Sequence, residues 1–264
     1  MFPRLISTPI FVLHTFGLFL AAAYLAALWW LMRGIKREGL DRETASGLGM
    51  WIIVGAILGA KAMMVVRFFP DYVANPRDLL SLATLQAAGD FYGGFAGAIA
   101  AAVIYFKNHP ELPAWHVADI SAPAIALGQG IGRIGCFMAG DDYGRPADLP
   151  WAVAFHDPDA ADIGGAPLGI PLHPVQLYES LACFALFFLL VHLTRRKRFV
   201  GEIILAYSIL YAIARFLLEY FRGDADRGFV LGGLFSTSQF IAIVVMMICV
   251  PLVFKLKGSK SLRF

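Results

Sequence analysis

Residues 201–221 read GEIILAYSILYAIARFLLEYF. The run is long enough to cross a bilayer, because the hydrocarbon core takes about 20 apolar residues in a helix. It also holds Arg215 and Glu219, which are four residues apart and therefore lie on one face of that helix. The stretch predicts a transmembrane helix that carries charged groups inside the membrane.

The rest of the chain repeats this apolar pattern. Of its 264 residues, 59% are hydrophobic and only 16% charged, which is too little polar surface for a soluble domain of this size. Further predicted spans are 10–32, 47–66, 92–106, 118–139, 175–193 and 233–255. The first is longer than a signal-peptide core and its basic residues follow it, so we expect it to be retained. The sequence predicts an all-α integral membrane protein, with about seven transmembrane helices forming a single transmembrane domain over residues 1–264.

Basic residues gather in alternate loops. They are concentrated in residues 33–46, in residues 194–200 and in the carboxyl-terminal tail. By the positive-inside rule, the amino terminus is expected on the periplasmic side and the carboxyl terminus in the cytoplasm. The longest outside loop, about 140–173, is rich in Pro, Gly, Asp and Ala and holds a candidate strand from Trp151 to Phe155. We expect a small periplasmic cap there.

Charged groups inside the predicted spans call for partners. An ionised side chain at the bilayer centre costs roughly 2.5 to 3.5 kcal/mol. Arg133 lies in one span, and Arg215 and Glu219 in another, with Tyr211 one turn earlier and Arg222 just beyond. A buried pair that fixes helix packing explains Arg215 and Glu219 equally well. Three arginines exceed what one glutamate neutralises, so we predict an external anion, and the planar guanidinium suits phosphate.

Other polar and small residues admit simpler interpretations. The glycine-rich stretch 128–145 around Arg133 and the pair Gly93 and Gly94 are typical of close helix packing. Asp119 and Glu202 are predicted to cap helix ends. The histidines are dispersed, and no paired His or Cys spacing predicts a metal site. The net charge is only +3, with its basic residues beside apolar runs, which argues against nucleic-acid binding.

Three ordered motifs resemble the prolipoprotein diacylglyceryl transferase family. They are Gly132-Arg133-x-Gly135 with Gly144, His173-Pro174-x-Gln176-Leu177-Tyr178-Glu179, and Tyr211-x-x-x-Arg215-x-x-x-Glu219-x-x-Arg222. Weaker similarities are His14 with Gly17, Asp119 with Ala122-Pro123, and Gly93-Gly94. The resemblance implies an enzyme of the bacterial inner membrane that moves a diacylglyceryl group from phosphatidylglycerol to the lipobox cysteine thiol of a prolipoprotein, releasing glycerol phosphate. It implies no cofactor, and as partners only that lipid, the signal-peptide segment with its cysteine, and membrane lipids.

The resemblance also implies roles for individual residues. Arg133 and Arg215 would stabilise charge on the leaving phosphate, with Glu219 orienting Arg215. The other candidate catalytic residues are Tyr92, Asp141 and His173. The candidate substrate-binding residues are His14, Gly93, Gly94, Cys136, Gly144, Gln176, Tyr178, Glu179, Tyr211 and Arg222.

The chain departs from the family pattern at several positions. Tyr92 stands where the family usually has a histidine, and a phenol with a reference pKa near 10 is a poor base. Cys136 and Ala139 replace asparagines, and Asp141 replaces a glutamate, with Asp142 beside it as a substitute. Two alternatives therefore stay open: a divergent paralogue with another acceptor, and a non-enzymatic phospholipid-binding protein. A retinal protein is excluded, because the last span lacks a lysine before Lys255.

Overall fold

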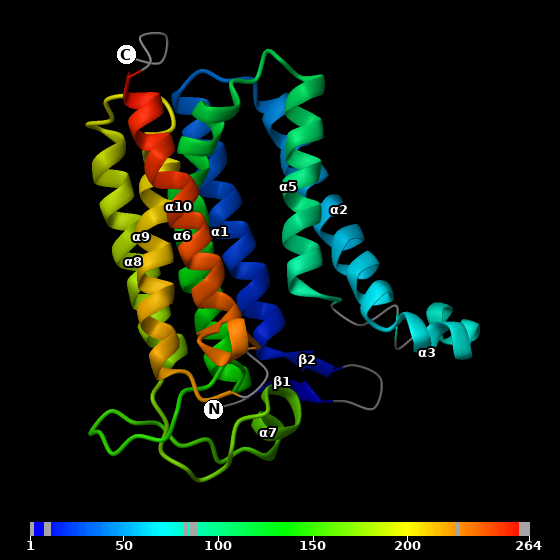
Figure 1. Cartoon of the computed structure of the whole chain (residues 1–264). Coiled ribbons are helices and arrows are strands. Elements are labelled where there is room, and N and C mark those ends of the chain that lie inside the picture. The colour runs from blue at the N-terminus through cyan, green and yellow to red at the C-terminus, as the bar shows by residue number, and fades with distance from the viewer. Residues whose placement is uncertain (1–2, 8–11, 82–83, 85–88, 225–227, 259–264) are drawn as a thin grey trace. The chain divides into compact units, whose positions relative to one another are not determined.

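The computed structural model describes residues 3–7, 12–81, 84, 89–224 and 228–258. Within those residues, the helices of 17 residues or more are α1 (Thr15–Arg37), α2 (Arg42–Arg67), α5 (Phe91–Asn108), α6 (Ala114–Ala139), α8 (Val175–Thr194), α9 (Glu202–Leu218) and α10 (Thr237–Gly258) (Figure 1). The shorter helices are α3 (Phe69–Ala74), α7 (Pro158–Gly164), η1 (Pro76–Leu80), η2 (Glu219–Phe221) and η4 (Leu231–Gly233). Two antiparallel hairpins pair β1 (Arg4–Ser7) with β2 (Val12–His14), and β3 (Phe229–Val230) with β4 (Phe235–Ser236).

Five of these helices are long and apolar enough to cross a membrane: α1, α2, α8, α9 continued by η2, and α10. The helices α5 and α6 also reach the length of a span, with 18 and 26 residues. α6 carries Asp119, Gln129 and Arg133 among its apolar residues, which lowers its mean hydropathy. The prediction of an all-α integral membrane protein is confirmed.

Two local predictions differ from the structure. The first helix begins at Thr15, because residues 12–14 pair with β1 in a register that places Arg4 opposite His14. The predicted start at Ile10 lies outside the described residues. In the stretch from Trp151 to Phe155, Val153 and Phe155 form isolated bridges with Leu172 and Leu168 instead of a strand. A short apolar run does not distinguish strand from helix or loop.

The chain forms two compact units, residues 1–31 with 115–264, and residues 32–114. In the second unit, α2 and α5 approach each other through glycines. A Cβ built on Gly59 would lie 2.3 Å from the carbonyl oxygen of Gly93, and one on Gly97 would lie 2.2 Å from that of Gly55. Because these contacts are backbone to backbone, the predicted packing face around Gly93 is confirmed.

The core of the first unit joins three long helices. Its buried residues are Ala122 and Ala126 of α6, Leu186, Phe187 and Leu190 of α8, and Ile203 and Tyr207 of α9. These helices lie side by side in Figure 1. The small alanines of α6 let the large side chains of α8 and α9 fill the space between the helices.

Asp119 joins α6 to the start of α9. Its carboxylate accepts hydrogen bonds from the backbone N–H groups of Gly201, Ile203 and Ile204 at 2.8 to 3.0 Å. The capping chemistry predicted for Asp119 is therefore present, but it serves a different helix. Glu202 accepts instead from the backbone N–H of Arg198 at 2.5 Å.

The loop of residues 140–173 has a small core of its own. Phe155, Ala160, Ala166 and Leu172 are buried together, and Phe137 of α6 and Tyr143 pack against them. Gly140 ends α6 with φ near +80°, a conformation that favours glycine and turns the chain away from the helix axis. The loop is thereby packed onto the end of α6, next to the candidate site.

Candidate active site

Three helices position a charged cluster at one end of the first unit. Nε of Arg133 on α6 lies 3.1 Å from Oε1 of Glu179, which sits in the first two turns of α8. The hydroxyl of Tyr211 on α9 donates to the same glutamate oxygen at 2.8 Å. Glu179 is only 3% exposed, so its charge depends on these two donors.

Asp142 connects Arg133 to a second guanidinium. Its two carboxylate oxygens accept hydrogen bonds from Arg133 and from Arg222. Arg222 also donates to both oxygens of Asp224, at 2.8 and 2.5 Å. Asp142 has φ near +54°, which is uncommon for a residue with a side chain and is tolerated best by Asn and Asp. The chain thus holds this carboxylate between two arginines in an uncommon backbone conformation.

The predicted pair of Arg215 and Glu219 is present. Nη1 of Arg215 lies 2.8 Å from Oε2 of Glu219, and Nη2 of Arg215 donates to the hydroxyl of Ser238 at 3.0 Å. Arg215 is 9% exposed and Glu219 is 2% exposed. Ser238 lies in the first turn of α10, so this pair links α9 to α10.

The count of acids made from the sequence is incomplete. It counted one glutamate against three arginines, whereas the structure sets four carboxylates around them: Asp142, Glu179, Glu219 and Asp224. No external anion is needed to neutralise Arg133, Arg215 and Arg222. The sequence count missed Glu179 and Asp142 because they approach Arg133 only through tertiary packing, and it missed Asp224 although this acid lies two residues after Arg222.

Hydrogen bonds between side chains and backbone hold the segment that carries Asp142. The amide of Gln176 donates to the carbonyl oxygen of Asp141 at 2.6 Å, and Asp142 donates its N–H to Oδ1 of Asp141 at 2.9 Å. Gly144 forms an isolated antiparallel bridge with Arg222. A Cβ on Gly144 would lie 2.2 Å from the carbonyl oxygen of His173, so only glycine fits.

Aromatic and polar groups border this segment. The ring Nδ1 of His173 lies 3.3 Å from the hydroxyl of Tyr178, which also accepts from the indole N–H of Trp151 at 2.8 Å. Sγ of Cys136 lies 3.8 Å from Nη1 of Arg133. The motif residues from α6 and α8 are therefore gathered around Arg133 and the loop that follows it.

The pKa values of Asp141 and Asp142 are shifted in opposite directions. Burial, followed by the neighbouring charge of Asp142, raises the pKa of Asp141. Burial also acts to raise the pKa of Asp142, but the guanidiniums of Arg133 and Arg222 overcome it and lower that pKa. Adjacent carboxyl groups whose pKa values are pushed apart are suited to separate roles, one as a fixed anion and one as a proton carrier.

The pKa of His173 is also shifted. Partial burial, together with the positive charge of Arg145, lowers it. This shift favours the neutral imidazole, the form that accepts a proton.

The remaining predicted residues belong to the amino-terminal hairpin and to the second unit. His14 ends β2 opposite Arg4 and is exposed. Tyr92, Gly93 and Gly94 start α5 in the second unit, where Asp90 caps the helix by accepting from the N–H groups of Tyr92 and Gly93. Tyr92 is 44% exposed.

Sequence reasoning missed Asp224 and Ser238. An acid two residues after Arg222 was a signal for the first, since Arg222-Gly223-Asp224 places donor and acceptor around a short turn. No local signal marks Ser238, which reaches Arg215 from another helix.

Cys136, Asp141 and Asp142 offer potential metal-ligand atoms within 4.8 Å of one another. Asp142 is already paired with Arg133 and Arg222, whose positive charges oppose a cation at the same place. The arrangement suits an anionic ligand of the arginines better than a metal ion.

Comparison with known proteins decides the family. Residues 3–255 match the family model of prolipoprotein diacylglyceryl transferase. The chain belongs to this family. A phosphatidylglycerol–prolipoprotein diacylglyceryl transferase of Clostridium tetani is 33% identical over 239 residues, covering 89% of this chain and 90% of the relative. Enzymes of the same name from Finegoldia magna and Geobacter sulfurreducens are 34% and 32% identical, covering 84% and 88% of this chain and 82% and 86% of the relatives.

Membership of the family and the five apolar helices together identify a bacterial inner-membrane protein. The match extends through α1, α2 and α5 as well as the unit that holds the charged cluster. The chain is therefore similar to the family along nearly its whole length.

Proposed function

We propose that this transferase joins a diacylglyceryl group from phosphatidylglycerol to the lipobox cysteine of a prolipoprotein, and that the donor's phosphate binds at Arg133 and Arg222 by replacing the carboxylate of Asp142. Diacylglyceryl transfer between these two substrates is the reaction of the family to which the chain belongs. The alternatives of another acceptor or a non-enzymatic role are not favoured, because the similar relatives carry the same enzyme name.

The proposed displacement of Asp142 by phosphate rests on the difference in side-chain exposure among the four acids of the cluster. The side chain of Asp142 is 27% exposed, whereas those of Glu179, Glu219 and Asp224 are 4%, 1% and 13% exposed. Solvated carboxylates leave an ion pair at a lower cost than buried ones. Asp142 is therefore the anion that an incoming phosphate displaces most readily.

The guanidiniums then act on the leaving group. In the proposed step, the sulfur of the acceptor cysteine bonds to the terminal glyceryl carbon of the diacylglyceryl group while the bond from that carbon to the phosphate oxygen breaks. The electron pair stays on the phosphate oxygen, and glycerol phosphate leaves. Arg133 and Arg222 stabilise the charge that develops there, since their N–H donors are already held in place.

A base must accept the thiol's proton. An unperturbed thiol has a pKa near 8.5, so only a small fraction is thiolate at pH 7. Asp141 has the raised pKa of a proton carrier and lies beside the arginine cluster. We assign the proton to Asp141, with His173 as the second candidate in the same unit.

The remaining residues hold this arrangement. Glu179 and Tyr211 orient Arg133, Glu219 orients Arg215, and Gln176 anchors the carbonyl of Asp141. In this proposal the amino terminus and the charged cluster face the periplasm, where exported prolipoproteins present their cysteine. The concentration of basic residues at the opposite end of α8, α9 and α10 supports that orientation.

The test is a transfer assay with purified protein in detergent, phosphatidylglycerol labelled in its acyl chains, and a peptide containing a lipobox cysteine. We expect label on the peptide with the native protein, and none above a boiled sample with Arg133→Ala or Arg222→Ala. A cysteine-to-serine peptide shows whether the thiol is the acceptor. Absence of transfer by the native protein, or full transfer by both variants, contradicts the proposal.

A further inference from the structure

A pocket of about 270 Å³ opens between the start of α9 and the end of α10, whereas the charged cluster uses the other ends of these helices. Its lining residues are Arg198, Phe199, Glu202, Ala206, Ile209, Val253 and Lys257. The candidate active site uses Arg215 and Ser238, at the other ends of the same two helices. From residue 202 to residue 215 α9 rises about 20 Å, so the pocket is separate from that site.

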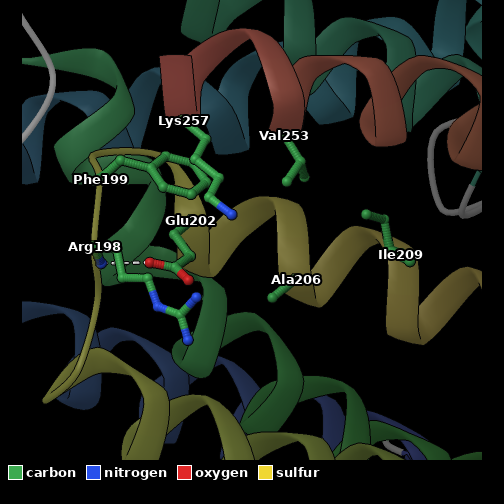
Figure 2. Close-up of a pocket in the computed structure, with 7 residues that line it drawn as sticks. All are labelled: Arg198, Phe199, Glu202, Ala206, Ile209, Val253 and Lys257. Carbon is green, nitrogen blue, oxygen red and sulfur yellow. Dashed lines mark hydrogen bonds between the residues drawn. The ribbon is translucent and has the colours of Figure 1, made fainter. Parts of the chain in front are cut away.

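Charged and apolar residues line different parts of this pocket. Figure 2 shows Arg198, Glu202 and Lys257 at one end, with Ala206, Ile209 and Val253 further along α9 and α10. Glu202, Ala206 and Ile209 are four and three residues apart, so they follow one face of α9 from its polar end into its apolar part. The pocket thus presents a charged rim and an apolar wall to one ligand.

The rim carries more positive than negative charge. The carboxylate of Glu202 is engaged by the backbone N–H of Arg198 at 2.5 Å, while the guanidinium of Arg198 forms no ion pair with the described residues. Arg195, Arg196 and Lys197 directly precede Arg198 in the chain, and Lys255 lies two residues before Lys257 on α10. The backbone donors at the start of α9 are taken by Asp119, so an anion here depends on the side chains of Arg198 and Lys257.

Two of the lining residues, Phe199 and Val253, belong to a buried cluster. Phe199, Leu205 and Leu256 are buried together, with Val253 against them. Phe199 is 3% exposed and Leu256 is 8% exposed. The residues on either side of the pocket are therefore held by the helix contacts of the unit itself.

We propose that this pocket binds an anionic phospholipid, with its phosphate at Arg198 and Lys257 and the first part of an acyl chain along Ala206, Ile209 and Val253. The volume is too small for a whole lipid, so the rest of the chains lies in the bilayer beside α9 and α10. Basic pockets between transmembrane helices recognise lipid headgroups in this way. The lipid here binds as a structural ligand and is not consumed, so the proposal is independent of the transfer reaction.

The experiment compares two double variants of the full chain with equal loss of charge. Arg198→Gln with Lys257→Gln removes the rim, whereas Arg195→Gln with Lys255→Gln removes exposed basic residues outside the lining. Native mass spectrometry in detergent counts bound cardiolipin, an anionic lipid that is not the transfer substrate, and bound phosphatidylcholine with the same acyl chains. Transfer activity is measured on the same samples.

We expect the native protein and the control variant to retain cardiolipin in preference to phosphatidylcholine, and the rim variant to bind it about 30-fold more weakly. Transfer activity in detergent should survive in both variants. Equal losses in the two variants indicate general charge attraction and overturn the proposal, as does no loss in either. If inorganic phosphate at matched concentration displaces the lipid, the ligand is a free anion and the lipid assignment is wrong.

Discussion

The carboxylate of Asp142 is hydrogen-bonded to the guanidinium of Arg133, although Asp142 lies beyond the end of α6 and nine residues further along the chain. The chain returns to its own helix because Gly140 turns it and Gln176 holds the carbonyl of Asp141. Arg133, the proposed phosphate ligand, is thereby paired with an acid of the same chain. This relationship sets up a competition between Asp142 and the phosphate that can be measured.

Asp142→Asn removes the competing charge and keeps the shape of the side chain. A partly exposed ion pair contributes about 0.2 to 1 kcal/mol, so we expect the KM for phosphatidylglycerol to fall about 1.4- to fivefold. Steady-state kinetics in detergent would measure it. Asp159→Asn is the matched control, because Asp159 pairs with Arg4 outside the cluster at 3.2 Å. A KM that rises in Asp142→Asn contradicts the exchange.

Gly144 and Gly132 give opposite predictions for the same substitution. A Cβ on Gly144 meets the backbone of His173, so Gly144→Ala should lower the melting temperature and the activity together. Gly132, one residue before Arg133, has nothing within 4 Å of its built Cβ. Gly132→Ala should be neutral or stabilise the helix by up to about 1 kcal/mol. Thermal unfolding in detergent tests both; equal effects of the two substitutions would show that the contact with His173 does not constrain the fold.

The raised pKa of Asp141 predicts the acid side of the pH–rate profile. A base must be ionised to act, so kcat/KM should fall as the pH drops through a value above the ordinary range of an aspartate. Asp141→Glu should retain this acid limb, whereas the residual activity of Asp141→Asn should lack it. The same limb in Asp141→Asn would remove Asp141 from the proton transfer and leave His173 as the base.

The lowered pKa of Asp142 predicts how the stability of the folded protein depends on pH. Its ionised form is favoured in the folded state, so its contribution to stability is present above the ordinary pKa of an aspartate. That contribution is lost as the pH falls through the lowered value. Between those two pH values, Asp142→Asn should show a smaller loss of stability on acidification than the native protein, as measured by thermal unfolding.

Tyr92 provides a test in cells. The chain should restore lipoprotein processing in bacteria depleted of their own diacylglyceryl transferase, because it belongs to that family with tyrosine at this position. Tyr92→His should restore it at least as well, while Arg133→Ala should not. Rescue by Tyr92→His alone, with no rescue by the native chain at equal expression, would identify a paralogue with a different acceptor.

Local signals in the sequence predicted the helices and the pair Arg215–Glu219. Apolar runs of span length and a spacing of four residues depend only on the geometry of one helix. The start of the first span was misplaced, because hydropathy does not separate residues 12–14 of β2 from the helix that follows.

Contacts between distant segments were harder to predict. Arg133 meets Glu179 from another helix, and Asp119 caps α9 instead of an end of its own helix. Both contacts depend on how α6, α8 and α9 pack, which no single segment encodes. The motifs nevertheless named Arg133, Glu179 and Tyr211 as candidates, since the family resemblance carries information about residues that are close only in the folded protein.

The most direct test of the phosphate exchange is a structure of the protein with a phosphonate analogue of phosphatidylglycerol that resists carbon–oxygen cleavage. We predict phosphonate oxygens within hydrogen-bond distance of Arg133 and Arg222, with the carboxylate of Asp142 moved away from both. An analogue bound elsewhere, with Asp142 still held between the two arginines, would contradict the account.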